Sequence, residues 1–263
     1  MLKTILIVES PNDAAFYKKL YALTISDKEE RIKVIVFEDL HNFDFDGKNQ
    51  RGYSLKTLEA KLEIIKRQLE KTGYEAVNHI AIIVDVDFPN DKNPNKKQDG
   101  GKENRLFQVS EAINSKFNIK LDFVQLGEGN IAHAPISLDE NTLIDNFFFS
   151  CFLTKNADSE GNLDYLLKDL ASKKEEAHHA NCLFAWQDCL KHHNKAIKEG
   201  YLVKLWVDYY IRFDTATKDE KSDAEIKLKF DYVMSTNKGE KIFNFEHPVL
   251  EAYKTYLSKI IIE

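Results

Sequence analysis

Short apolar runs and helical patterns alternate along the first half of the chain. Residues 5–8 (Ile-Leu-Ile-Val) and 80–84 (Ile-Ala-Ile-Ile-Val) are continuously apolar, which is typical of strands buried on both faces of a parallel sheet. Residues 32–37 and 121–126 predict two further strands. Leucine and isoleucine recur at helical spacing between residues 55 and 69, so an amphipathic helix is expected there, ending at Gly73.

Polar residues mark where the helices begin. Ser10 is a favourable N-cap, Pro11 suits the first helical position and Asp13 suits the first turn, so a helix follows the first strand directly. A further helix is expected near residues 103–116. The resulting β-α-β-α-β-α-β order predicts an α/β fold with an open, mainly parallel sheet flanked by helices and joined by right-handed crossovers.

The second half of the chain has mainly helical patterns. One long helical stretch is expected over residues 172–199, another over 201–213, and a last helix over 249–261. We therefore expect an α/β domain in residues 1–130 and a mainly helical region in residues 131–263. The boundary lies between residues 127 and 140. The helical half is either a separate domain or an extension packed on the sheet.

Composition and charge narrow the class of protein. The chain has 263 residues, 43% of them apolar, and a formal net charge of −6, which is a globular composition that argues against a broad basic surface for nucleic acid. No apolar stretch approaches the roughly 20 residues of a membrane span. Glu9 cuts short the apolar run near the N-terminus, and only three cysteines are present. A cytoplasmic location without a signal peptide is expected.

Three acidic residues follow predicted strands. Glu9 comes directly after the strand at 5–8, and Asp85 and Asp87 follow the strand at 80–84. Sites in open α/β sheets lie beyond the carboxyl ends of the strands, so these side chains are expected to converge. Converging carboxylates repel one another unless a cation neutralises them, and Mg²⁺ prefers oxygen ligands. The set indicates phosphoryl transfer or phosphodiester hydrolysis with Mg²⁺ or Mn²⁺.

Two segments resemble the Toprim domain of topoisomerases, primases and OLD-family nucleases. They are residues 5–16 (ILIVESPNDAAF) and 80–87 (IAIIVDVD), which match that domain's Glu after the first strand and its Asp-x-Asp after a later one. Residues 161–167 and 245–250 are similar, more weakly, to segments of small bacterial Toprim-like proteins of unknown function. The resemblance implies a Toprim-like sheet, metal on Asp85 and Asp87, and Glu9 as a metal ligand or general acid/base.

The nucleases are the nearest functional analogue within the Toprim group. The chain lacks the strand-gate segments of topoisomerases and the zinc segments of primases. The resemblance therefore implies metal-dependent cleavage of DNA or RNA, in defence or repair, with water as the nucleophile. The chain carries no Gly-x-x-x-x-Gly-Lys-Ser/Thr phosphate-binding loop, so an ATPase would be a separate partner. No membrane partner is expected, and a homo-oligomer stays open.

Other candidates in the second half follow from the same resemblance. OLD-type nucleases supply a lysine near the metal, and Lys204 lies in a loosely similar segment. The alternative for Lys204 is a surface lysine on a packed helix, because most lysines are exposed. Asp164 and Asp145 are candidate ligands of a second metal on similar grounds.

The loop that leaves the strand at 80–84 carries basic residues close to Asp87 in the sequence. Contacts with the phosphate backbone of a nucleic acid would be natural for Lys92, Lys96, Lys97, Lys102 and Arg105. A solvated charged loop is the alternative, because three acidic residues in the same stretch dilute its charge.

Two further clusters have structural interpretations. Asp13 completes a variant capping box with Ser10. Residues 178–193 are rich in His and Cys, but Cys182 and His193 are 11 residues apart, or about 16 Å along a helix. One Zn²⁺ cannot bridge the pairs at that distance. Cys182 and Cys189 stand beside apolar residues and are expected in the core.

Two other functions stay open. The chain could be a non-catalytic Toprim-like module that regulates or binds a partner ATPase or effector, or a phosphatase or phosphoacceptor that uses the same acids. Residues 1–130 hold 20 basic and 21 acidic side chains, so the acidic excess lies mostly in residues 131–263. This charge distribution argues against tight salt-driven binding of nucleic acid and permits a metal-bridged contact with a few phosphates.

Overall fold

The chain divides into two compact units. The computed structural model describes residues 4–25, 32–36, 55–72, 77–87, 100–138 and 142–262. The first unit comprises Met1–Thr154 and Ala252–Glu263, and the second comprises Lys155–Glu251. The boundary expected between residues 127 and 140 falls inside the first unit. The reason is that the strand at Phe148–Thr154 belongs to the sheet of this unit and the helix at the end of the chain packs against that sheet.

The first unit is built on an open, mainly parallel sheet, as the sequence predicts. The strand order is β2-β1-β3-β7-β4, and β1, β2, β3 and β7 are parallel, while β4 is antiparallel to β7. The strands are β1 (Thr4–Val8), β2 (Ile32–Val36), β3 (His79–Asp85), β4 (Ile131–His133) and β7 (Phe148–Thr154). A short antiparallel pair, β5 (Ile136–Ser137) and β6 (Leu143–Ile144), lies apart from this sheet.

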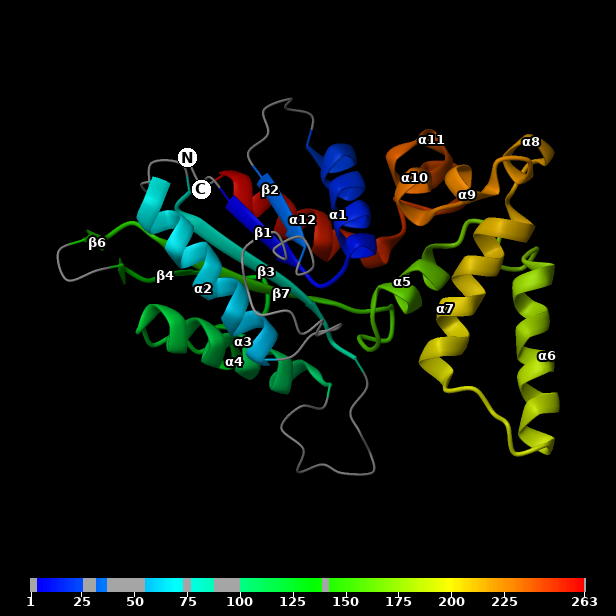
Figure 1. Cartoon of the computed structure of the whole chain (residues 1–263), viewed down its shortest axis with the longest axis horizontal. Helices are drawn as coiled ribbons and strands as arrows, with labels where there is room; N and C mark the ends of the chain where they lie inside the picture. Colours follow the sequence, from blue (N-terminus) through cyan, green and yellow to red (C-terminus); the bar gives the residue numbers. More distant parts are fainter. Residues whose placement is uncertain are drawn as a thin grey trace. The chain divides into compact units, whose positions relative to one another are not determined.

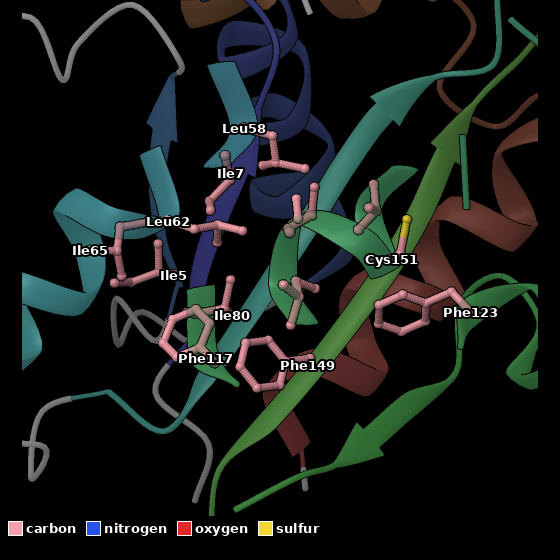
Figure 2. Packing of buried hydrophobic residues seen from close by; sticks show 14 of the residues in the cluster. Ile5, Ile7, Leu58, Leu62, Ile65, Ile80, Phe117, Phe123, Phe149 and Cys151 are labelled. Atoms are coloured by element: carbon pink, nitrogen blue, oxygen red, sulfur yellow. The ribbon is translucent and has the colours of Figure 1, made fainter. Parts of the chain in front are cut away.

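Helices cover both faces of this sheet (Figure 1). On one face, α2 (Leu55–Thr72) and α3 (Lys102–Phe117) close the main hydrophobic core. Figure 2 shows Ile5, Ile7 and Ile80 of the strands packed with Leu62 of α2 and Phe117 of α3. The other face is covered by α1 (Pro11–Thr24) and α12 (Glu251–Ile262). Because alternate strand residues point to opposite faces, the continuous apolar runs supply both layers.

The prediction of a strand at residues 121–126 is wrong. Asp122 is instead the N-cap of a short helix, α4 (Phe123–Leu126), where its carboxylate accepts the backbone N–H groups of Val124 and Gln125. Within α4 only Phe123 is buried, so the segment cannot line two faces of a sheet. The fourth parallel strand is instead β7, which pairs with β3 and whose apolar run lies in the region expected to be mainly helical.

The second unit is mainly helical, as predicted. Its longer helices are α5 (Leu163–Leu170), α6 (His178–His192) and α7 (Glu199–Tyr209), which continues into the π-helical turn η3 (Tyr210–Asp214). Shorter helices follow: α8 (Lys218–Lys221), α9 (Ala224–Lys227), α10 (Phe230–Ser235), α11 (Asn237–Ile242) and the 3₁₀ turn η4 (Pro248–Leu250).

The single helical stretch expected over residues 172–199 is shorter in the structure. Only His178–His192 is α-helical. Asn194 adopts a left-handed backbone conformation with φ of 54°, which ends helices readily because Asn tolerates that region. At the other end, Ala171 forms an isolated β bridge with Phe243, and turns and a bend occupy residues 172–176 before the helix begins.

Asp214 caps the N-terminus of α6 from a distant position in the sequence. The residue at the N-cap position, Ala177, has no side chain that can accept a hydrogen bond. The Asp214 carboxylate accepts the backbone N–H groups of His179 and Ala180, both at 2.9 Å, and lies 2.8 Å from His179 Nδ1. Burial would raise the pKa of Asp214, but these hydrogen bonds outweigh it and lower the pKa.

A buried chain of hydrogen bonds ties α12 to the sheet. Thr4 Oγ1 donates to the carbonyl oxygen of Ile260 (2.7 Å) and lies 3.0 Å from His79 Nδ1. Ser150 Oγ lies 2.9 Å from His79 Nε2 and 2.7 Å from the hydroxyl of Tyr256. A neutral His79 with its proton on Nδ1 satisfies the whole chain, because Thr4 then accepts from Nδ1 and Ser150 donates to Nε2. Burial lowers the pKa of His79 to about 4.

None of the helices in the described part of the chain combines the length and apolar character needed to cross a bilayer.

The pKa of His79 predicts a loss of stability in mild acid. In the unfolded chain the imidazole takes up a proton near pH 6.5, whereas in the folded protein it does so near pH 4. Between these values the unfolded state binds more protons, so the free energy of unfolding decreases as the pH is lowered, by about 1.6 kcal/mol between pH 6.5 and pH 5. His79→Gln should flatten this slope, measured by urea unfolding with hydrogen exchange of β3 peptides. A matched change at the exposed His192 should keep the wild-type slope, and an unaltered slope in His79→Gln would contradict the assignment.

The cap on α6 predicts a stability effect confined to the second unit. Asp214→Ala should lower the free energy of unfolding by about 1–2 kcal/mol, because two backbone N–H groups lose their acceptor. Asp214→Asn should cost less, since the amide oxygen still accepts. Both tryptophans, Trp186 and Trp206, lie in this unit, so tryptophan fluorescence in urea reports its unfolding. Asp208→Ala, which removes a partly exposed pair with Arg212, is the control, and equal effects at both positions would reject the cap.

Candidate functional site

Glu9 and Asp85 meet where β1 and β3 end. The two strands are parallel neighbours, so their carboxyl ends lie at the same edge of the sheet. The Glu9 carboxylate accepts the backbone N–H of Asp85 at 2.8 Å. The structure therefore brings together two of the acids that the sequence singles out.

Negative charge is crowded around Glu9. The pKa of this carboxyl is raised to about 8: burial is the largest cause, the charges of Asp13 and Asp87 act in the same direction, and Arg105 and the N–H of Asp85 act in the opposite direction. Within the part of the chain that the structure describes, the acids Glu9, Asp13, Asp85 and Asp87 thus gather at one edge of the sheet together with the guanidinium of Arg105. Their mutual repulsion is the property that a divalent cation would relieve.

Arg105 reaches this site from the start of α3. Its guanidinium forms an ion pair with Asp87 and donates to Gln108 Oε1 at 3.2 Å. The backbone returns to the site just before α3, because the N–H of Gly101 donates to the carbonyl of Val86 at 2.8 Å. Asp87 itself has a positive φ of 53°, which turns the chain sharply directly after β3.

Tyr17 and Thr154 are neighbours of the acids: Thr154 pairs with Asp85 across the strands, and the charges of Asp13 and Asp85 act on Tyr17. The Tyr17 hydroxyl lies 2.8 Å from Thr154 Oγ1, and the carbonyl of Thr154 accepts the N–H of Val86 at 3.0 Å. Burial raises the pKa of Tyr17 well above its usual value, with Tyr253, Asp13 and Asp85 adding to the effect and the Thr154 hydrogen bond opposing it. Tyr17 is therefore held protonated, so it positions its neighbours and is unsuited to attack as a phenolate.

Asp13 has a capping contact and an electrostatic effect on the site. The Ser10 hydroxyl accepts the N–H of Asp13 at 3.3 Å and donates to its carboxylate, so the expected cap at the start of α1 is confirmed. The buried carboxylate of Asp13 also raises the pKa of Glu9.

The carboxylates at this edge are of the chemical type that binds a hard divalent cation, but they do not converge on one position where an ion could bind. Carboxylate oxygens are the ligands that Mg²⁺ and Mn²⁺ prefer. Among the described residues, however, no three His, Cys, Asp or Glu side chains form a group ready to hold one ion. Asp87 is turned toward Arg105, so metal binding by this set requires that ion pair to open.

Of the lysines predicted to contact nucleic acid, the structure describes only Lys102. Lys92, Lys96 and Lys97 lie outside the described residues. Lys102 is exposed and its ammonium group lies 3.5 Å from the buried carboxylate of Glu128, which in turn accepts the N–H of Leu153 at 3.3 Å. Lys102 thus has a structural contact beside its predicted role.

Asp164 and Lys204 both belong to the second unit, and the charge of Lys204 acts on Asp164. Asp164 lies in the first turn of α5, and burial raises its pKa while the charge of Lys204 on α7 lowers it. Lys204 is exposed. Asp145, the other candidate for a second metal, is exposed in the first unit, where its carbonyl oxygen lies 2.6 Å from His133 Nε2. Their predicted roles stay predictions.

The expectation that Cys182 and Cys189 lie in a core is wrong. Both are exposed on α6, and Cys151 of β7 is the buried cysteine. The physical reason is that α6 buries only Ala180, Leu183 and Gln187, so most of its circumference faces outward. His179 is engaged by Asp214.

From the sequence, Arg105 belongs with the loop lysines, and neither Tyr17 nor Thr154 has a predicted role. A signal for Arg105 was present, since it lies one turn after Gly100-Gly101 at the start of a helix that follows the Asp-x-Asp strand. Its burial could not be foreseen, because that depends on packing between elements distant in the sequence. Thr154 was hidden because its strand was assigned to the helical half.

Comparisons with known proteins identify a family without assigning an activity. A search of curated proteins and a search of solved structures both give no match. Residues 3–262, nearly the whole chain, match DUF3226, which is described as a protein of unknown function. On this match, the chain with its acidic sheet edge belongs to the DUF3226 family.

Proposed function

We propose that this chain is a Toprim-type, Mg²⁺- or Mn²⁺-dependent hydrolase of phosphodiester bonds in DNA or RNA. The observation that carries the proposal is the Glu9 carboxylate bound to the Asp85 N–H among three further acids, at the carboxyl ends of parallel strands. This is the place where open α/β sheets hold their sites. The motif resemblance in residues 5–16 and 80–87 supports the same assignment.

In this proposal Asp85 and Asp87 hold the cation, and Glu9 either completes the metal site or handles a proton. When bound, the metal supplies Lewis-acid stabilisation of charge on the phosphate and favours an activated water. Glu9 is kept in place by the Asp85 N–H. Tyr17 is protonated and bonded to Thr154, so water is the nucleophile. The roles of Lys204 and Asp164 and the phosphate contacts of Lys92, Lys96, Lys97 and Lys102 belong to this proposal as well.

The partners in this proposal follow from what the chain carries. DNA or RNA is the substrate. A separate ATPase is the natural partner, because OLD-family nucleases work with one and this chain has no nucleotide-binding loop of that kind. A near-neutral first half suits contact with a few phosphates in place of a long charged surface.

A second candidate function has its own supporting observation. Arg105 already supplies a positive charge to Asp87, and no three ligands among the described residues are gathered for one ion. A non-catalytic Toprim-like module that binds or regulates a partner ATPase or effector would need no metal. It could keep the acidic edge neutralised by this ion pair.

Loss of the acids distinguishes the two functions. Asp85→Asn should weaken Mn²⁺ binding, measured by calorimetry, at least about tenfold, because it removes a charged oxygen ligand. Glu9→Gln should weaken it as much if Glu9 completes the metal site, and should leave it unchanged if Glu9 handles a proton. Nicking of supercoiled DNA or cleavage of single-stranded RNA in Mg²⁺ should fall at least about a hundredfold. Glu111→Gln, a change of the same kind at an exposed position on α3, should leave both unchanged.

Two results would count against the hydrolase. Cleavage that survives both Asp85→Asn and Glu9→Gln would place the activity elsewhere. A wild-type chain that binds no Mn²⁺ and cleaves neither polymer would favour the non-catalytic module.

A further inference from the structure

Arg105 is an unusual residue for its position. Its side chain is only 7% exposed, while that of its partner Asp87 is 40% exposed. Arginine is seldom buried unless it is paired. The guanidinium also donates to Gln108 one turn further along α3, so its position is set from within its own helix. Asp87, by contrast, stands at a sharp turn directly after β3.

The ion pair conflicts with metal binding at the same carboxylate. If a divalent cation takes Asp87, the guanidinium of Arg105 loses that carboxylate while remaining largely buried. A buried charge whose partner is removed is strongly unfavourable. The conflict is resolved if another anion takes the place of Asp87. The planar fork of guanidinium donors matches two oxygens of a phosphate.

The location of Arg105 suits this exchange. The guanidinium contacts Asp87, and its charge also acts on Glu9, so an anion bound to it would lie beside both acids. The exposed side of Asp87 opens the pair to solvent. Among the described residues the charges also balance better, because the acids with Arg105, a divalent cation and a phosphodiester come closer to neutrality than the acids with Arg105 alone.

We propose that Arg105 binds the substrate phosphate, and that it is released from Asp87 when a divalent cation takes that carboxylate. The inference rests on the proposed function. It adds a substrate-binding residue that lies outside the Glu and Asp-x-Asp motifs. It also makes metal and phosphate binding cooperative. The cation offsets the charge of Asp87 when the phosphate takes Arg105, and the phosphate offsets the charge of Arg105 when the cation takes Asp87.

Calorimetry with thymidine 3′,5′-bisphosphate as the probe tests the exchange. The wild-type chain should bind the probe at least about tenfold more tightly with Mn²⁺ than without metal. Arg105→Met should lose at least about tenfold of this affinity, because it removes charge-assisted hydrogen bonds. It should still bind Mn²⁺ as tightly as the wild type or more so. Arg105→Lys should recover only part of the probe affinity. Lys120→Met, the same charge change at an exposed residue after α3, should have no effect.

Asp87→Asn should change probe affinity in the direction opposite to Arg105→Met, which a purely structural role of the ion pair would not produce. It removes the carboxylate that competes for Arg105, so probe binding without metal should become about tenfold tighter, while Mn²⁺ binding weakens. This gain should vanish in the double variant Asp87→Asn with Arg105→Met. Probe binding unaffected by Arg105→Met in a chain that binds Mn²⁺ would overturn the inference and leave the hydrolase standing. If the wild type binds no Mn²⁺ but Asp87→Asn still shows the Arg105-dependent gain, the phosphate site stands and the hydrolase fails.

Discussion

The parallel pairing of β3 with both β1 and β7 is the constraint on which the candidate site depends. Backbone hydrogen bonds align Thr4–Ile7 with His79–Ile82 and the whole of β3 with β7. Parallel strands end at the same edge, so residues far apart in the chain must meet there. Glu9, Asp85 and Thr154 share that edge for this reason. An antiparallel partner for β3 would separate them by the length of a strand.

The two ends of this sheet use polar groups in opposite ways. Near the amino ends, Thr4, His79, Ser150 and Tyr256 form a chain of neutral groups. Each polar atom there has a partner, so burial costs little and α12 is held to the sheet. At the carboxyl ends, ionisable acids are crowded and one carboxyl has a raised pKa. The first arrangement serves stability. The second stores electrostatic repulsion, which is typical of functional sites.

The guanidinium of Arg105 offsets part of the negative charge at the acidic edge. The Arg105 side chain extends from α3, is largely buried, and forms an ion pair with the more exposed carboxylate of Asp87. Without a positive charge, four neighbouring acids would favour protonation or unfolding. Under our proposals the same contact would distinguish two states, one in which Arg105 offsets the charge of Asp87 and one in which an external cation and anion replace that pair. The hydrolase would use both states, whereas the non-catalytic module would need only the first.

Much of the architecture follows from local signals. The apolar runs at residues 5–8 and 80–84, the Ser10 cap and the spacing of leucines in α2 each match their elements. The convergence of Glu9 with Asp85 also followed from topology rules. Local signals failed where a weak pattern competed with packing. Residues 121–126 became a helix because Asp122 caps it and only Phe123 is buried, while the apolar run at 148–154 became the missing strand.

The sequence by itself therefore determined the α/β class, the position of the acids at the strand ends and the cap on α1. Only the tertiary structure decided that α12 returns to the first unit, that Asp214 caps α6, and that Arg105 lies buried against Asp87. The physical reason is range. Caps, periodicity and strand ends are set by neighbours within a few residues, so composition and spacing reveal them. Burial of a charge or a hydroxyl depends on which distant side chains surround it, and that is settled only when the elements pack.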